Sequence, residues 1–206
     1  MLKLWGRVNS SNVQKVLWLC EELNIPYERT EAGMQFGVVN EPAYRTMNPN
    51  GRVPTIDDEG FVLWESNAIV RYLAAKHAPN ALYPADLKVR ADADRWMDWA
   101  TSTLGGVIVP VFWTLIRTPA EKRDATKLAA DVKALGDVMG ALEQGLQGRK
   151  YVAGDAFSIG DIPVGINTYR FFALDIARPS LPNVEAWYKR LCERPAYQKW
   201  IMKPLT

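Results

Sequence analysis

The chain has 206 residues, of which 48% are hydrophobic, and its 25 Lys and Arg residues almost balance its 23 Asp and Glu residues, leaving a net charge of +2. This length allows one large domain or two small ones, and the balanced charge gives no reason to expect a nucleic acid or a membrane surface as a partner. Two cysteines without CxxC spacing and a single histidine argue against a metal site or a Ser-His-Asp triad.

The first residues, MLKLWG, form no charged-then-apolar leader. No apolar run approaches the length of about 18 residues that a membrane span needs. We therefore expect a cytoplasmic protein in a reducing compartment, with no membrane span.

The first 30 residues predict a βαβ unit. Leu2–Trp5 is typical of a short strand, and Ser10 to Asn12 are residue types that begin helices. Apolar residues then recur at helical spacing from Val13 to Leu23, and Pro26 lies beyond the end of that helix. Tyr27–Thr30 follows as a second strand. A βαβ unit implies a parallel strand pair with a right-handed crossover.

The next segment predicts a ββα unit. A short helix is expected over 42–47, and strands over 55–57 and 61–64 pair as an antiparallel hairpin across Asp58-Glu59-Gly60. A helix from Ser66 to His77 closes the unit. Residues 1–78 are thus predicted to form one α/β domain around a mixed four-stranded sheet.

After a linker at 79–88, the rest of the chain, 89–206, predicts an all-helical domain. A long helical region is expected over 89–117, bent at Pro110 or broken near Gly105. Capping boxes at Thr118–Glu121 and Ser158–Asp161 predict the starts of two helices, the first with an apolar stripe over 125–146 and the second buried. Further helices are expected over 184–193 and 195–202.

The stretch from Asn48 to Tyr72 carries the strongest functional signal. If the Val53-Pro54 bond is cis, the Val53 N–H and C=O are left to bind an extended peptide like an added strand. Glu65-Ser66 then places a carboxylate, a hydroxyl and free N–H groups at a helix start, which suits the ammonium and carboxylate of an amino acid. The alternative is an ordinary hairpin followed by a helix cap.

Three motifs resemble those of the cytosolic glutathione S-transferases. RVP at Arg52–Pro54 is similar to the family's cis-proline turn, ESNAIVRYL at Glu65–Leu73 to its γ-glutamyl site, and SIGDI at Ser158–Ile162 to the cap of its buried C-terminal helix. The resemblance covers nearly the whole chain and is closest to small bacterial serine-type members, which are theta- or phi-like. It implies that residues 1–78 are thioredoxin-like.

The resemblance implies an enzyme that binds glutathione, stabilises its thiolate and conjugates it to a small hydrophobic electrophile, with a role in detoxification. Glutathione is then a co-substrate, and no prosthetic group is expected. The resemblance also implies a homodimer. Residues 10–15 fit the pattern S-x-N-x-x-[RK] of serine-type members, so Ser10 is the first candidate to hold the thiolate, with Ser11 next and Asn12 as a further donor. The alternative is that all three only cap a helix.

The same resemblance assigns the remaining contacts. Val53, in the turn with Pro54, binds the cysteinyl backbone, while Glu65 and Ser66 hold the γ-glutamyl end. No basic residue lies in 33–42, so Arg52, Gln35 and Phe36 are the candidates for the glycyl carboxylate. The electrophile pocket is expected between the domains, with these candidate residues: Val8, Asn9, Trp113 and Arg117.

Cys20 and Cys192 fall on predicted helices and are expected to be small core residues. Because no cysteine stands at the serine position, conjugation is favoured over thiol-disulfide exchange. Two alternatives stay open. One is another glutathione-dependent reaction at the same site, such as peroxide reduction, dehalogenation or isomerisation. The other is a non-catalytic ligand-binding module.

Overall fold

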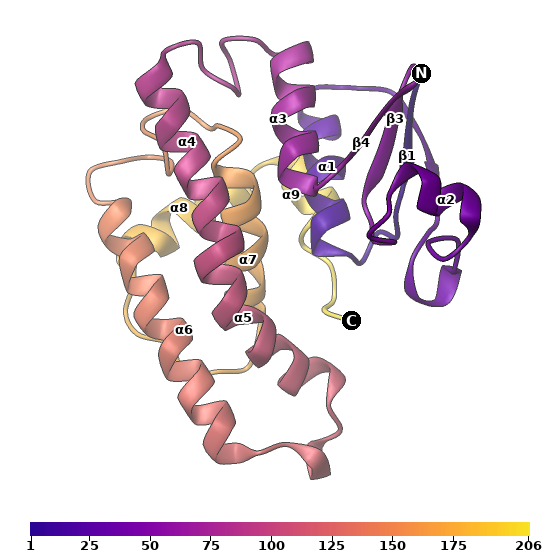
Figure 1. Cartoon of the computed structure of the whole chain (residues 1–206). Helices are drawn as coiled ribbons and strands as arrows, with labels where there is room; N and C mark the ends of the chain where they lie inside the picture. Colours follow the sequence, from indigo (N-terminus) through magenta and orange to yellow (C-terminus); the bar gives the residue numbers. More distant parts are fainter. The chain divides into compact units, whose positions relative to one another are not determined.

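The computed structural model describes all 206 residues (Figure 1). The chain divides into two compact units, Met1–Tyr83 and Pro84–Thr206. The division falls inside the segment 79–88 where a linker is expected.

The first unit is built on a four-stranded sheet in the order β2-β1-β3-β4. Its strands are β1 (Leu2–Trp5), β2 (Tyr27–Thr30), β3 (Thr55–Asp58) and β4 (Phe61–Trp64). β1 runs parallel to β2 and antiparallel to β3, and β3 pairs antiparallel with β4. Leu4 lies opposite Ile56 in the ladder, and both side chains are fully buried. The predicted mixed sheet is confirmed.

Four helical segments accompany the sheet: α1 (Ser11–Glu22), the 3-10 turn η1 (Met34–Phe36), α2 (Pro42–Met47) and α3 (Ser66–His77). Helices α1 and α3 pack against each other and lie together on one side of the sheet (Figure 1). Val13, Val16, Ile69 and Leu73 are fully buried. Because both helices are anchored by these apolar faces, their first turns are held in place at the residues predicted to bind the ligand.

The second unit is entirely helical, as predicted. It begins with a continuous segment made of α4 (Leu87–Trp99), η2 (Ala100–Leu104), α5 (Gly105–Phe112) and η3 (Trp113–Arg117). The short turn η4 (Ala120–Lys122) precedes α6 (Ala125–Gly145), α7 (Asp161–Ala173), α8 (Pro182–Cys192) and α9 (Pro195–Trp200). The expected break near Gly105 is absent: wider π-type turns at η2 and η3 keep the segment helical, with Pro110 inside α5.

The capping box predicted at Thr118–Glu121 is wrong. The Thr118 hydroxyl donates to the Trp113 carbonyl instead, and so belongs to the end of the preceding helix. Asp124 is the true N-cap of α6, since its carboxylate accepts a hydrogen bond of 2.9 Å from the Lys127 N–H. Of the residues in the apolar stripe predicted for α6, three are buried within the helix: Leu135, Met139 and Leu142.

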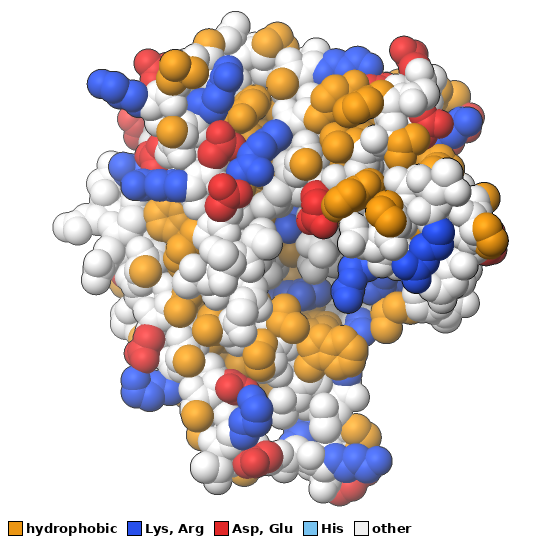
Figure 2. Space-filling model, in the orientation of Figure 1, with side chains coloured by type: hydrophobic (Ala, Val, Ile, Leu, Met, Phe, Trp, Pro, Cys, Tyr) orange, Lys and Arg blue, Asp and Glu red, His pale blue; other side chains and the backbone are white.

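The segment Leu87–Arg117 is long and apolar enough to cross a membrane by length and composition, with a hydropathy of 1.5 over its best window. The expectation that no apolar stretch reaches such a length is therefore wrong. The core helix of a soluble protein can meet the same criterion. Here Leu104, Ile108 and Val111 are fully buried, while 28% of that window as a whole is buried. On the face drawn in Figure 2, basic and acidic side chains are interspersed, in keeping with the small net charge.

Candidate active site

Ser10 is the N-cap residue of α1, with an extended backbone at φ −87° and ψ 119°. Its carbonyl accepts the first helical hydrogen bond, from the Gln14 N–H at 2.8 Å. Its side chain makes no capping hydrogen bond and is only 8% exposed. The hydroxyl is therefore not used to cap the helix and can donate to an acceptor bound at this end of α1.

Ser11 and Asn12 are the first two residues of α1. The Asn12 side chain is exposed, and its Oδ1 accepts a hydrogen bond of 3.3 Å from the Ser66 hydroxyl. The N–H groups of a helix's first turn carry partial positive charge and stabilise an anion placed there. The choice between Ser10 and Ser11 as thiolate donor stays a prediction.

The turn at Val53 has the backbone that the sequence predicts. The Val53-Pro54 peptide bond is cis. Neither the N–H nor the C=O of Val53 makes a hydrogen bond within the chain. An extended peptide lying alongside Val53 can therefore pair with both groups, as a strand would.

Two buried side chains that the sequence analysis missed support this turn. The Tyr44 hydroxyl donates to the Arg52 carbonyl at 2.6 Å and lies 2.8 Å from Thr55 Oγ1. Asn48 Nδ2 donates to the same two oxygens at 2.9 and 3.0 Å. Burial raises the pKa of Tyr44, which keeps its hydroxyl protonated as a donor. The run NPNGRVP contains Asn48, but nothing local in the sequence identifies Tyr44 as its companion.

Glu65 precedes α3 with a left-handed backbone, at φ +71° and ψ 110°. A residue with a side chain seldom adopts this conformation, and such residues concentrate at functional sites. The Glu65 side chain is exposed, whereas Ser66, the first residue of α3, is buried. The structure thus holds a carboxylate, a hydroxyl and the N-terminus of a 12-residue helix at one point.

A lysine reaches the same point from α1. Lys15 Nζ donates to Ser66 Oγ at 3.2 Å, and the Lys15 residue is only 7% exposed. Its ammonium brings a positive charge beside the start of α3, where a ligand carboxylate is expected. The sequence places Lys15 at the last position of the S-x-N-x-x-[RK] pattern but does not predict its contact with Ser66.

These residues surround a small cleft with a volume of about 60 Å³. All five predicted glutathione-binding residues line it, together with Asn12, Asn48 and Asn50; the five are Arg52, Val53, Pro54, Glu65 and Ser66. Asn48 and Asn50 were not predicted. Ser10 and Ser11 do not line the cleft. They directly precede Asn12 at the start of the same helix.

The structure adds one basic group near the Val53 turn. A Cβ atom placed on Gly33 would lie 3.2 Å from Arg7 Nη1 and 3.4 Å from a Val53 methyl group. The Arg7 guanidinium and the Val53 side chain therefore flank the same glycine. Gln35 and Phe36, the other glycyl candidates, are exposed on η1.

The four electrophile candidates are divided between the two units. Val8 and Asn9 lie in the loop between β1 and α1, where Val8 is exposed. Trp113 and Arg117 lie on η3 of the helical unit; Trp113 is 50% exposed, and the Arg117 guanidinium lies 4.8 Å from its ring centre. Their role stays a prediction.

The two cysteines differ. Cys20 is buried in α1, and burial raises the pKa of its thiol to about 12, so it supplies no thiolate. Cys192 at the end of α8 is only partly buried, so its expected place in the core is wrong; burial also raises its pKa. No group of three or more His, Cys, Asp or Glu side chains is placed to hold a metal ion.

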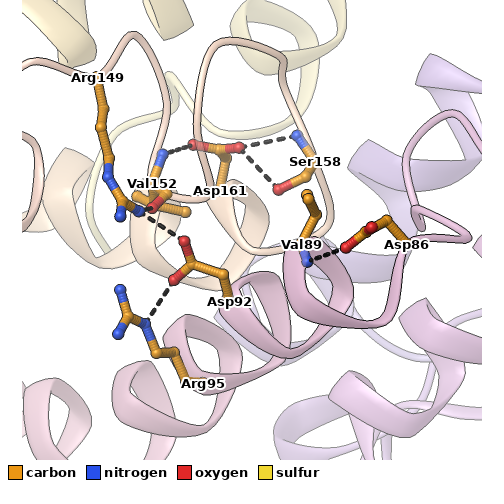
Figure 3. Close-up of polar contacts among 8 residues, drawn as sticks. All are labelled: Asp86, Val89, Asp92, Arg95, Arg149, Val152, Ser158 and Asp161. Carbon is orange, nitrogen blue, oxygen red and sulfur yellow. Dashed lines mark hydrogen bonds and ion pairs between the residues drawn. The ribbon is translucent and has the colours of Figure 1, made fainter.

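Asp161 has a structural role in the helical unit, as predicted from the second capping box. Its carboxylate accepts hydrogen bonds from the Ser158 N–H and the Val152 N–H at 2.8 and 3.0 Å (Figure 3), and from the Trp187 indole at 2.9 Å. Arg149 joins Val152 to α4, since it donates to the Val152 carbonyl and to Asp92. This network ties α7 to α4 and α8.

Comparison with known proteins gives a consistent result. The profile of the glutathione S-transferase N-terminal domain matches residues 1–75, and that of the glutathione S-transferase C-terminal domain matches 106–195. The chain is 41% identical to glutathione S-transferase GstB of Escherichia coli, with both chains covered completely. It is 30% identical to the probable glutathione S-transferase GSTF2 of rice over 98% of each chain.

Solved structures agree. A theta class glutathione S-transferase from the citrus canker pathogen Xanthomonas axonopodis pv. citri, crystallised with glutathione bound, superposes with a TM-score of 0.94. It is 49% identical to this chain, and the match covers 100% of this chain and 99% of the other. Glutathione transferase F7 of Populus trichocarpa superposes with a TM-score of 0.86 at 26% identity, with both chains covered completely.

Proposed function

The chain belongs to the glutathione S-transferase family, and from this premise we propose that its first unit binds glutathione in the cleft between the Val53 turn and the start of α3. The observation that carries the proposal is the shared lining: Val53, Glu65 and Ser66, predicted separately from the sequence, lie around one cleft. Each supplies a different part of what a γ-glutamyl tripeptide needs.

The γ-glutamyl end has one ammonium and one carboxylate. We propose that the exposed Glu65 carboxylate binds the ammonium. The Ser66 hydroxyl and the N–H groups of the first turn of α3 receive the carboxylate, with the Lys15 charge beside them. The unpaired N–H and C=O of Val53 bind the cysteinyl main chain. Arg7 joins Arg52 as a candidate for the glycyl carboxylate.

The chemistry requires a thiolate. A free thiol has a pKa of about 8.5, so only a few per cent is ionised at neutral pH. Lowering that pKa by about two units requires about 2.7 kcal/mol of preference for the anion. The hydroxyl of Ser10 or Ser11, with the N-terminal field of α1, is a sufficient source, since charge-assisted hydrogen bonds and helix termini each contribute on the order of 1 kcal/mol or more.

The thiolate then attacks the electrophile directly. A carbon–sulfur bond forms and the leaving group departs with its electron pair, so no covalent enzyme intermediate is needed. Thiolate stabilisation and proximity are the two sources of rate. From the family resemblance we propose that a small hydrophobic electrophile is the second substrate; Val8 and Asn9 in the first unit and Trp113 and Arg117 in the second are the candidates to bind it.

Other glutathione-dependent reactions, namely peroxide reduction, dehalogenation or isomerisation, use the same thiolate and form the second candidate function. A non-catalytic binding module is the third. The cleft, with Glu65 and Ser66 in place, supports glutathione binding in all three cases. The uncommitted Ser10 hydroxyl favours the two catalytic ones.

From the family resemblance we also propose a cytoplasmic homodimer with a role in detoxification. Sedimentation should give about twice the mass of one chain. A sedimentation mass equal to one chain at micromolar concentration would exclude the dimer.

Two assays on the purified protein test the function together. We expect retention on immobilised glutathione and elution by free glutathione. With glutathione and an activated aryl chloride, we expect formation of the thioether and release of chloride. Retention without turnover, using a panel that includes peroxide and haloalkane substrates, would leave only the binding module. Absence of retention would refute the proposed site.

A further inference from the structure

Arg170 on α7 has an environment unlike that of the other helical-unit arginines. Its guanidinium carbon lies 4.3 Å from the centre of the Phe112 ring. It makes no hydrogen bond and no ion pair with any residue of the chain, although the residue is partly buried. None of its nitrogen atoms is sealed from solvent. A guanidinium has five N–H donors, so this one is available to a bound anion.

A second cation shares the same ring. The Arg117 guanidinium lies 5.5 Å from the centre of the Phe112 ring and 4.8 Å from that of Trp113. It donates to the main-chain oxygen of Thr206, the last residue of the sequence, at 2.9 Å. Burial, and then the charge of Arg117, lower the pKa of Arg170 to about 10. No acidic group acts on Arg170 in the opposite direction. Two like charges thus lie over one phenyl ring, and of the two only Arg170 lacks a polar partner.

Arg178, in the same unit, shows the arrangement that a purely structural arginine adopts. Its guanidinium also lies over a phenyl ring, that of Phe172, at 6.0 Å. Unlike Arg170, it donates to the carbonyls of Phe171 and Leu174 at 3.4 and 2.8 Å. A partly buried charge without such partners is costly, and the cost is recovered when an anion binds.

The neighbouring surface suits a flat apolar group attached to that anion. Trp113 is exposed, and so are Val109 and Ile116 on the same helical segment. Exposed aromatic and aliphatic side chains of this kind provide apolar contact area, and the face of Trp113 can stack on a ring.

We propose that Arg170 and Arg117, with the rings of Phe112 and Trp113, bind the carboxylate or sulfonate of a small aromatic molecule. This makes aromatic electrophiles that carry an anionic group the preferred substrates of the enzyme. The second statement rests on the proposed transferase function. In the reaction, the sulfur of glutathione bonds to the ring carbon, chloride leaves with the bonding pair, and the anionic group is unchanged.

The site itself is tested without glutathione. Calorimetry would compare 3,5-dinitrobenzoate, an unreactive anion, with neutral 1,3-dinitrobenzene. We expect the anion to bind more tightly, and Arg170→Met to weaken its binding on the order of tenfold, because a charge-assisted pair is lost. Arg178→Met, the matched control, should leave both affinities unchanged. Equal affinities for the two probes, or an unchanged affinity in Arg170→Met, would overturn the site.

The preferred substrate class is tested by turnover. The ratio of kcat/KM for 4-chloro-3,5-dinitrobenzoate to that for 1-chloro-2,4-dinitrobenzene should fall in Arg170→Met and partly recover in Arg170→Lys. If the anion binds as expected but the ratio does not change, the substrate assignment is wrong. If the unreactive anion binds while neither chloride compound is turned over, the transferase proposal fails and the binding site stands.

Thermal unfolding separates binding from a structural role. Because Arg170 has no polar partner to leave behind, Arg170→Met should unfold at an equal or higher temperature than the wild type. Arg178→Met should unfold at a lower temperature, because two carbonyls lose their donor. A large loss of stability in Arg170→Met would show that the arginine is there to hold the fold, and would contradict the proposal.

Discussion

Glu65 combines an unfavourable backbone conformation with an exposed carboxylate that lines a cleft. A left-handed conformation costs a residue with a side chain on the order of 1 kcal/mol or more. Glycine would relieve that cost, so a binding role for the carboxylate gives a physical reason for a glutamate at this position.

Glu65→Gln tests that explanation, because glutamine keeps the size and shape but removes the charge. We expect glutathione to bind on the order of tenfold or more weakly, since the ligand ammonium loses its ion pair. Calorimetric titration measures the change. Glu59→Gln, on the exposed turn of the hairpin, is the control and should bind as the wild type does. Equal affinities in the two variants would remove Glu65 from the site.

Ser10 should affect the thiol rather than the rest of the tripeptide. In Ser10→Ala the pKa of bound glutathione should rise by about one unit or more, because a single hydrogen bond to an anion contributes about 1.5–3 kcal/mol. The rate at neutral pH should fall, while S-methylglutathione, which has no ionisable thiol, should bind unchanged. If Ser11→Ala shows this pattern and Ser10→Ala does not, Ser11 is the donor.

At the scale of helices and strands, most of the first unit could be predicted from its local patterns. Alternating and helical spacing of apolar residues located β1, α1 and α3, because those elements bury one regular face. Tyr44 could not be predicted, because its partners Arg52 and Thr55 come from a later turn and strand. The Thr118 box was mistaken because the hydroxyl had a competing acceptor one turn earlier.

The contact between α1 and α3 leads to a prediction about Lys15. Lys15→Met should weaken glutathione binding several-fold, because a positive charge beside the ligand carboxylate is removed, on the order of 1 kcal/mol. Lys15→Arg should restore part of the affinity. Binding is measured by calorimetry, with circular dichroism to confirm that α1 is intact. If Lys15→Met binds glutathione as tightly as the wild type does, the Lys15–Ser66 hydrogen bond contributes to folding and not to ligand binding.

Asp161 makes stability depend on pH. Burial raises the pKa of Asp161 from 3.8 to about 6, despite its four donors. The folded state then holds the proton more tightly than the unfolded state, so this group lowers the free energy of unfolding as pH rises from about 4 to about 6. Urea unfolding of wild type and Asp161→Asn at several pH values isolates the effect. The advantage of the wild type should be smaller at pH 7 than at pH 4.5; a constant difference would contradict the raised pKa.

At the scale of the whole molecule, the family and the two-unit organisation could be recognised from three short motifs. The residues of each motif are adjacent in the sequence, so each motif can be recognised without knowledge of the packing. The electrophile roles of Val8 and Trp113 stay predictions, because the two residues belong to different units. Arg170 was not predicted at all, since only the packing of α7 against α5 reveals its missing partners.

Catalysis depends on one property of the glutathione complex, an ionised sulfur at the start of α1. Ultraviolet titration of thiolate absorbance, with glutathione bound to the wild-type protein, measures it directly. We predict a pKa about two units below the value of about 8.5 for a free thiol. A bound thiol that ionises near 8.5, with glutathione shown by calorimetry to occupy the protein, would contradict the account.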